Sequence, residues 1–261
     1  MKSTLKKKSL EDSLSDHTAQ VIESESRVEV VGEGEFKELL RKGERFLKTK
    51  LPSVINDDDF NEKHAIATWK ITETLTPKNI NKFLQLCVCY ENMDLYNPNT
   101  GFLISRLIRN SYHKGHRTFN FDISGLNPID QFGSFLKGKE RKQIKVNVVG
   151  DLGYEPFQDV EYGVFCINGN VRGLCGMGAK NSKFIINGNS GIQIGHDSER
   201  CTFVLNGEDH SRSYSNHLLS NTFKTPNKKT LNILLDEVCS GNRIVYIHSN
   251  GKEEVVRSYS K

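Results

Sequence analysis

The sequence predicts a mainly β protein, a parallel β-solenoid with rungs of about 19 residues, a helical N-terminal cap and a small α+β C-terminal cap. Three observations carry this prediction. Apolar residues recur at helical spacing up to about residue 117 and at alternate positions after it. A short pattern begins at positions 146, 165, 184 and 203, an even spacing without gaps. Asparagine occurs 23 times, never in the first 50 residues, and several of these residues fall into columns of that repeat.

The composition excludes several classes of protein. With 36 basic and 32 acidic side chains, the net charge of +4 on 261 residues is too small to argue for nucleic acid. An apolar share of 36% argues against wholesale disorder, and no apolar run approaches the roughly 18 residues of a membrane span. The six cysteines form no C-x2-C pair, which argues against a zinc site built from paired cysteines and favours free thiols in a reducing cytoplasm. The basic residues of the N-terminus are followed by no continuous apolar stretch, so we expect no secretory signal.

Four regions are expected along the chain. They are 1–32 (a disordered or weakly helical tail), 33–117 (a helical region and cap), 118–208 (the solenoid) and 209–261 (the α+β cap). Helical spacing predicts a helix near 35–50, interrupted around Gly43, and residues 64–72 are typical of a strand. Thr76 and Pro77 predict the N-cap and the first position of a second helix.

A third helix is predicted after a break at Asn97-Pro98-Asn99. Asn99 or Thr100 is expected to cap its start, and Gly115 its end. We expect the second and third helices to form an antiparallel hairpin that covers one open end of the solenoid, because exposed rung edges promote aggregation.

Four segments align at the 19-residue period. They are 146–151 (VNVVGD), 165–170 (FCINGN), 184–189 (FIINGN) and 203–208 (FVLNGE). A fifth, looser copy begins at Phe121, 25 residues before Val146, which implies a six-residue insertion in the loop 126–142. The repeat is expected to end at Gly207.

Each column of this alignment has a physical role in a stacked coil. The first and third positions are apolar and are expected to point inward. Three further columns are Asn168, Asn187 and Asn206 (an amide ladder), Gly150, Gly169, Gly188 and Gly207 (a sharp corner with positive φ), and Glu161, Lys180 and Glu199 (alternating charges). Because stacking accounts for these residues, they predict a fold and not a ligand site.

The segment Gly188-Asn-Ser-Gly191-Ile-Gln-Ile-Gly195 resembles the G-x-x-G-x-x-x-G repeat of the C-terminal domain of the glutamate synthase large subunit. One of the subunits of formylmethanofuran dehydrogenase shares that repeat. Other rungs depart from it: Arg172 replaces the middle glycine and Phe157 the last. The resemblance covers residues 144–208 and implies a right-handed β-helix that serves as a structural and inter-subunit element without catalytic residues. The whole chain is also similar to archaeal solenoid proteins with I-N-G-N rungs.

A mixed cap is predicted after the repeat. Residues 209–221 are polar and are typical of a loop, and Thr222 to Thr225 are typical of a strand. A helix is expected around 228–239, followed by a β-hairpin that turns at Asn250-Gly251.

The residue pattern favours no active site. Asp159 and Asp197 share a column, but they lie two rungs apart, about 10 Å. His196 is interpreted as a surface residue in a rung turn. Cys175 and Cys201 are expected to pack inward, because no His or Asn partner is evident for either.

One segment outside the solenoid could bind an anion. His113, Lys114, His116 and Arg117 place four potential cations beside Tyr112, a pattern that suits a phosphate. The alternative is that these cations only stabilise the C-terminus of their own helix.

The sequence favours a non-catalytic scaffold or interaction protein without cofactor or metal, although enzymatic activity is left open. A protein partner is expected and a membrane is not, nucleic acid is disfavoured, and a carbohydrate partner is left open. One alternative is a carbohydrate-active enzyme or carbohydrate-binding module, because solenoids of this shape carry such activities. Another is an accessory subunit of a redox complex, which only the repeat resemblance suggests.

Overall fold

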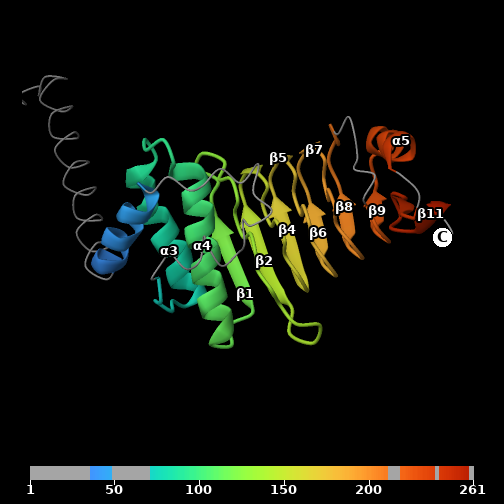
Figure 1. Cartoon of the computed structure of the whole chain (residues 1–261). Coiled ribbons are helices and arrows are strands. Elements are labelled where there is room, and N and C mark those ends of the chain that lie inside the picture. The colour runs from blue at the N-terminus through green and yellow to red at the C-terminus, as the bar shows by residue number, and fades with distance from the viewer. Residues whose placement is uncertain (1–35, 49–70, 211–217, 239–240, 259–261) are drawn as a thin grey trace, which may run out of the picture. The chain divides into compact units, whose positions relative to one another are not determined.

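The structure is a computed structural model that describes residues 36–48, 71–210, 218–238 and 241–258 (Figure 1). The chain divides into two compact units, residues 1–41 and 42–261. The tail expected at 1–32 and most of the strand expected at 64–72 lie outside the described residues. Residues 36–47 form one continuous helix, so the interruption expected around Gly43 is absent from it.

The helical cap consists of α3 (Pro77–Leu86), the 3₁₀ helix η1 (Cys87–Tyr90) and α4 (Tyr96–His113). The start of α3 is confirmed, because Thr76 Oγ1 accepts a hydrogen bond from the backbone N–H of Asn79 at 3.3 Å. The expected start of α4 at Asn99 or Thr100 is wrong. The helix begins at Tyr96, and Pro98 lies in its first turn, where a missing N–H is tolerated.

Asn99 has a different capping role from the one predicted. It is fully buried inside α4, and its Nδ2 donates hydrogen bonds to the carbonyl oxygens of Phe46 and Leu47, both at 3.2 Å. These carbonyls belong to the last residues of the helix 36–47, where intrahelical donors run out. Asn99 thus closes the C-terminal end of that helix.

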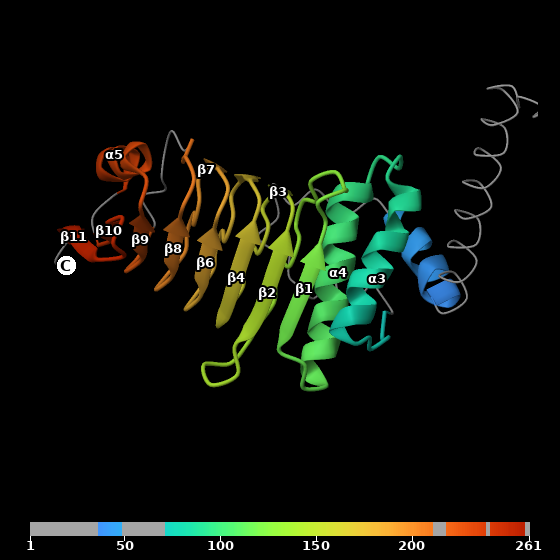
Figure 2. The ribbon, with the colours of Figure 1, turned by 180° about the vertical axis from the view of Figure 1, so that it is seen from behind.

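The solenoid is confirmed. Its main sheet has the order β1-β2-β4-β6-β8-β9-β10-β11, parallel from β1 to β10, with β11 antiparallel at the edge (Figures 1 and 2). These strands are β1 (Thr118–Asp122), β2 (Ile144–Val149), β4 (Gly163–Asn168), β6 (Lys183–Ile186), β8 (Thr202–Leu205), β9 (Thr222–Thr225), β10 (Arg243–Ile247) and β11 (Glu253–Ser258). A second parallel sheet contains β3 (Leu152–Tyr154), β5 (Val171–Gly173) and β7 (Ser190–Ile192).

The predicted register of the regular rungs is confirmed. Val146 pairs with Phe165, Phe165 with Phe184, and Phe184 with Phe203. The rings of Phe184 and Phe203 stack with centroids 4.8 Å apart, and those of Phe203 and Phe223 are 5.2 Å apart. All five side chains are fully buried, so this column forms the core of the coil.

Two features of the repeat differ from the prediction. Phe119, not Phe121, pairs with Val146, so the first step is 27 residues long and contains eight extra residues (27 − 19 = 8). The expected register is therefore wrong by two residues, a shift that leaves the same side chains facing inward. The repeat also continues past Gly207, because Phe203 pairs with Phe223 in β9.

The glycine column is explained by crowding. Only Gly150 has a positive φ, +118°, so the expectation of a left-handed corner fails for the other three glycines. A Cβ on Gly169 would lie 2.0 Å from the carbonyl oxygen of Gly150, and one on Gly188 would lie 2.4 Å from that of Gly169. A Cβ on Gly207 would lie 2.3 Å from the carbonyl oxygen of Gly188. Successive rungs approach too closely here for any side chain.

The amide ladder is confirmed. Asn187 Nδ2 donates to Asn168 Oδ1 at 2.5 Å, and Asn206 Nδ2 donates to Asn187 Oδ1 at 2.6 Å. A neighbouring column adds side-chain to backbone bonds: Asn170 Oδ1 accepts from the N–H of Asn189 at 2.8 Å. The charged column is also in register, since Glu161, Lys180 and Glu199 are joined by parallel bridges.

Side chains of the two caps satisfy backbone groups at the first rung and at the end of α5. At the first rung, Asn81 Oδ1 of α3 accepts a hydrogen bond from the N–H of Asp122 at 3.2 Å, and Gln85 Nε2 donates to the Asp122 carbonyl. Beyond the last rungs, α5 (Lys228–Glu237) begins at the N-cap Asn227, and β10 and β11 form the predicted hairpin. Arg257 of β11 donates to the carbonyl of Val238, just after α5, at 2.8 Å.

Candidate anion-binding surface

All four side chains of the predicted anion site are exposed. His113 is the last residue of α4, Lys114 is its C-cap, and His116 and Arg117 lie between Gly115 and β1. Gly115 has a φ of +104°, which confirms its predicted role in ending the helix. The structure thus places the four residues in one short connection at the solvent-facing end of α4.

A second basic segment lies beside this connection. Tyr112 Oη donates a hydrogen bond to the carbonyl of Lys142 at 2.6 Å, which links the last turn of α4 to the loop before β2. The carbonyl of Arg117 accepts from the N–H of Lys145 at 2.7 Å. Figures 1 and 2 show the end of α4 and this loop at the same, lower edge of the solenoid.

The loop ends in a tight turn. The N–H of Lys142 donates to the carbonyl of Lys139 at 2.8 Å, and the N–H of Lys139 donates back to the carbonyl of Lys142 at 3.3 Å. Lys139, Glu140, Arg141 and Lys142 are all exposed, as is Lys145 at the start of β2. We define the basic surface as residues 113–117 and 139–145.

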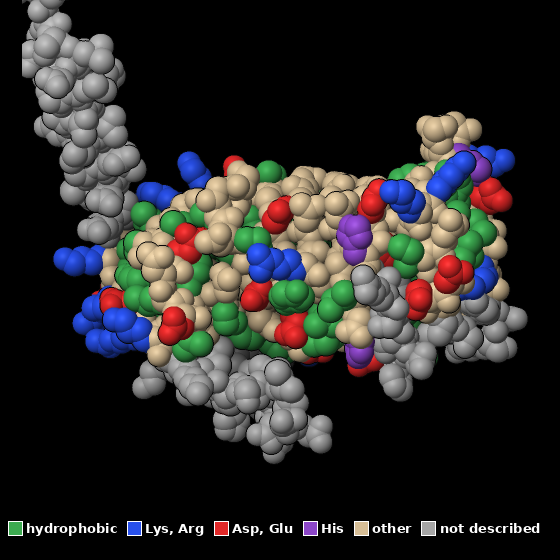
Figure 3. Space-filling model, turned by 90° about the horizontal axis from the view of Figure 1, so that it is seen from above, with side chains coloured by type: hydrophobic (Ala, Val, Ile, Leu, Met, Phe, Trp, Pro, Cys, Tyr) green, Lys and Arg blue, Asp and Glu red, His purple; other side chains and the backbone are tan. Residues whose placement is uncertain are grey.

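The basic surface concentrates the positive charge of the chain. It holds six Lys or Arg side chains and one carboxylate, a formal charge of 6 − 1 = +5 with histidines neutral. The whole chain carries +4, so the remaining residues sum to 30 − 31 = −1. Over the middle of the solenoid in Figure 3, by contrast, basic and acidic side chains are interspersed.

Sequence reasoning missed the residues of the loop. Lys139, Arg141, Lys142 and Lys145 belong to a run, 137–145, in which five of nine residues are basic. This run of basic residues could have been recognised in the sequence, but it precedes the aligned segments of the repeat, which begin at Val146. The run lies close to the end of α4 because Thr118 in β1 pairs with Lys145 in β2, a pairing that the sequence does not reveal.

The carboxylates of the solenoid do not form an acid–base pair. Gly178 lies between Asp159 and Asp197 in their column, and the Asp159 carboxylate occupies the space above it, 2.2 Å from where a Cβ on Gly178 would be. Two rung spacings, about 10 Å, separate the two aspartates. His196 Nδ1 lies 3.1 Å from Asp197 Oδ2, its neighbour in sequence. This arrangement does not join the two carboxylates into one centre.

Cys175 and Cys201 are both buried, as predicted. Cys175 is fully buried and Cys201 is 2% exposed. Burial raises the pKa of the Cys175 thiol far above its usual range and raises the pKa of Cys201 to about 11. Both side chains are therefore neutral thiols at physiological pH, a form that is a poor nucleophile.

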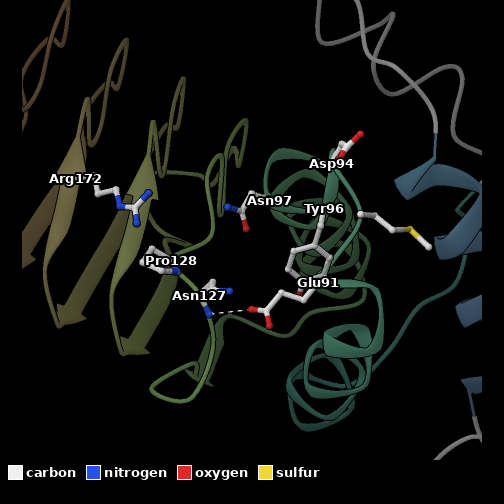
Figure 4. Close-up of a pocket in the computed structure, with 8 residues that line it drawn as sticks. Glu91, Asp94, Tyr96, Asn97, Asn127, Pro128 and Arg172 are labelled. Atoms are coloured by element: carbon white, nitrogen blue, oxygen red, sulfur yellow. Dashed lines mark hydrogen bonds between the residues drawn. The ribbon is translucent and has the colours of Figure 1, made fainter.

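A small polar pocket lies between η1, α4 and the first turns of the solenoid (Figure 4). Its volume is about 180 Å³. It is lined by Glu91, Met93, Asp94, Tyr96, Asn97, Asn127, Pro128 and Arg172. Glu91 Oε1 accepts a hydrogen bond from the N–H of Asn127 at 3.1 Å, so one of the two carboxylates joins the cap to the solenoid.

Neither a metal centre nor a membrane span is found among the described residues. Within them, no group of three or more His, Cys, Asp or Glu side chains is arranged to hold a metal ion. No helix in the described part of the chain is long and apolar enough to cross a membrane.

Comparisons with protein-family models, curated proteins and solved structures found no match to this chain. The relation to the two enzyme repeats therefore stays a prediction.

Proposed function

We propose that this protein is a non-catalytic interaction protein whose solenoid presents the basic surface to an acidic macromolecular partner. The observation that carries the proposal is the concentration of charge: +5 lies on two adjoining segments of a chain whose total is +4. A surface of one sign attracts oppositely charged partners and accelerates their association.

Capping of α4 does not account for this charge. Lys114 lies at the helix C-terminus, where a cation stabilises the helix by about 0.3–1 kcal/mol. Lys139, Arg141 and Lys142 lie in a β-turn and gain nothing from the helix dipole. Half of the six cations therefore have no part in capping the helix, which supports a role in binding.

The repeating residues also support the proposal, because their roles are structural. The phenylalanine, glycine and asparagine columns are explained by core packing, close rung contact and ladder hydrogen bonds. Residues with such a role do not need a catalytic explanation. The solenoid is then a rigid support, and the first turn is the part that departs from it.

Co-purification of the full-length chain under gentle conditions tests this proposal. A charge-reversed variant, Lys139→Glu/Arg141→Glu/Lys142→Glu, should lose the macromolecules that the unmodified chain retains. The control variant is Lys78→Glu/Lys228→Glu/Lys252→Glu, which reverses three exposed lysines outside the basic surface and should retain them. Equal retention by all three proteins would contradict the proposal.

A further inference from the structure

We infer that the partner of the basic surface is a double-stranded nucleic acid, held through its phosphate backbone and read without base contacts. This inference rests on the proposed function and names the chemical class of its partner. It departs from the expectation based on net charge, because an average over 261 residues conceals a local charge of +5.

The basic surface has no apolar centre. Protein–protein interfaces have a core of aromatic and aliphatic side chains surrounded by a polar rim. Among the described residues, the exposed large apolar side chains are Val149, Tyr154, Ile192, Leu219, Val255 and Val256. None of them lies in residues 113–117 or 139–145. A surface of cations without an apolar centre matches a polyphosphate better than a folded protein.

A duplex fits this surface better than a single strand does. Proteins that bind single strands stack bases on exposed aromatic rings. The aromatic residue next to the basic surface, Tyr112, is half-buried, and its hydroxyl is engaged by the carbonyl of Lys142. It is therefore poorly placed to stack on a base, whereas a duplex offers its phosphates without unstacking.

The cations are held on a rigid turn and continue along the sheet. The paired backbone bonds between Lys139 and Lys142 hold the turn, so little backbone entropy is lost on binding. The cations continue across the N-terminal ends of neighbouring strands of the main sheet. Lys145 in β2 is in register with Val164 in β4, which is in register with the exposed Lys183 in β6. Two strand spacings, roughly 10 Å, separate the two lysines, which suits contacts to several phosphates.

Fluorescence anisotropy with a labelled 20-base-pair duplex tests the inference on the full-length chain. The duplex is supplied as RNA in one arm and as DNA in the other, and the salt concentration is varied between 50 and 200 mM. If four to six phosphates are contacted, the logarithm of the binding constant should fall against the logarithm of salt with a slope of about −4 to −5. A matched single strand should bind more weakly.

The two charge-reversed variants provide the control. Lys139→Glu/Arg141→Glu/Lys142→Glu should weaken duplex binding by at least about 100-fold at 100 mM salt. Lys78→Glu/Lys228→Glu/Lys252→Glu has the same net charge and should weaken it by less than about threefold. Circular dichroism of each variant confirms that the solenoid is retained, so that a loss of binding is not a loss of fold.

A polyglutamate probe distinguishes failure of this inference from failure of the proposed function. Binding of polyglutamate but not of duplex, abolished by the first variant, would overturn the nucleic acid and leave an acidic protein as partner. Duplex binding that both variants reduce equally would also overturn the inference, because it would reflect net charge alone. No binding of either probe, together with equal co-purification by all three proteins, would overturn both proposals.

Discussion

The first turn of the solenoid and the regular turns after it are built on the same core but differ in what their surface residues do. Between Val146 and Phe203 every step has the same length, 19 residues, and the repeated positions are used for stacking. The step from Phe119 to Val146 is 27 residues, and part of this excess forms the basic turn. This difference places the cations that we propose to bind a partner where the 19-residue period is broken.

The largest expected effect is in the core of the regular turns. Phe184 is fully buried and stacks between Phe165 at 5.2 Å and Phe203 at 4.8 Å. Phe184→Ala should lower the free energy of unfolding by about 3–5 kcal/mol, measured by chemical denaturation. Tyr154→Ala, at a side chain that is 45% exposed, should change it by less than about 1 kcal/mol. Equal effects would mean that the column does not form the core.

Substitutions in the glycine column test why glycine is required there: close contact between rungs or a positive φ. Gly169→Ala would place a Cβ 2.0 Å from the Gly150 carbonyl oxygen, and we expect a loss of about 3 kcal/mol. The control is Gly125→Ala, in the first turn, where nothing lies within 4 Å of the added Cβ. Its thermal unfolding should match that of the unmodified chain. A tolerated alanine at Gly169 would contradict the crowding explanation.

The amide ladder predicts graded effects. Asn187 makes two ladder bonds, to Asn168 and Asn206, whereas Asn206 makes one, to Asn187, in the described structure. Asn187→Ala should destabilise by about 1–2 kcal/mol and Asn206→Ala by about half as much. Denaturant titrations of both variants give the ratio. Equal losses would show that the bonds are not the source of the stability.

The basic turn should be neutral for stability. Lys139→Glu/Arg141→Glu/Lys142→Glu changes only exposed side chains, so its melting temperature should stay within a few degrees of the unmodified protein. A melting temperature lowered by more than about 10 °C would show that the turn supports the fold. The contrast between the first turn and the regular turns would then fail.

A slight, pH-dependent effect on stability is expected at Glu155. Burial raises the pKa of its carboxyl, while the hydrogen bond from Gln131 opposes the shift. Because the folded-state pKa is raised, ionisation destabilises the fold above that pKa and has no such effect below the unfolded pKa. Glu155→Gln should therefore raise the melting temperature slightly at pH 7 and leave it unchanged near about pH 3.

Glu208 is the matched control for that measurement, with the opposite sign. Its hydrogen bond and ion pair with Lys229, at 2.9 Å, hold the pKa of its carboxyl below its usual range. The stabilisation is present above the unfolded pKa and is lost as the pH falls through the folded one. Glu208→Gln should thus lower the melting temperature slightly at pH 7. Shifts of the same sign in the two variants would contradict this explanation.

The sequence predicted the structure where the same residue type recurs in successive rungs, and did not predict it elsewhere. The phenylalanine and asparagine columns were predictable, because a fixed period and side-chain chemistry determine them. The register of the first rung was not, since a slip of two residues from Phe119 to Phe121 keeps every side chain on its face. The sequence also could not show that Gly169 is required by a neighbouring carbonyl instead of by its own φ.

Of the two segments of the basic surface, only the first could be predicted from the sequence. His113, Lys114, His116 and Arg117 stand out as a cluster along the chain. Their neighbours at 139–145 are distant in sequence, and the parallel pairing of β1 with β2 brings them together. A pairing across an insertion of unknown register cannot be inferred from one sequence.

The constant period of the regular turns fixes the distance along the solenoid in steps of one rung. Each added or deleted 19-residue rung would move the basic turn and the β10–β11 hairpin apart or together by roughly 4.8 Å, the spacing of neighbouring strands. Neither end would need to change its own contacts, because each rung touches only its neighbours. Duplicating or removing a segment such as 184–202 would therefore adjust the distance between the basic turn and the β10–β11 hairpin in fixed increments.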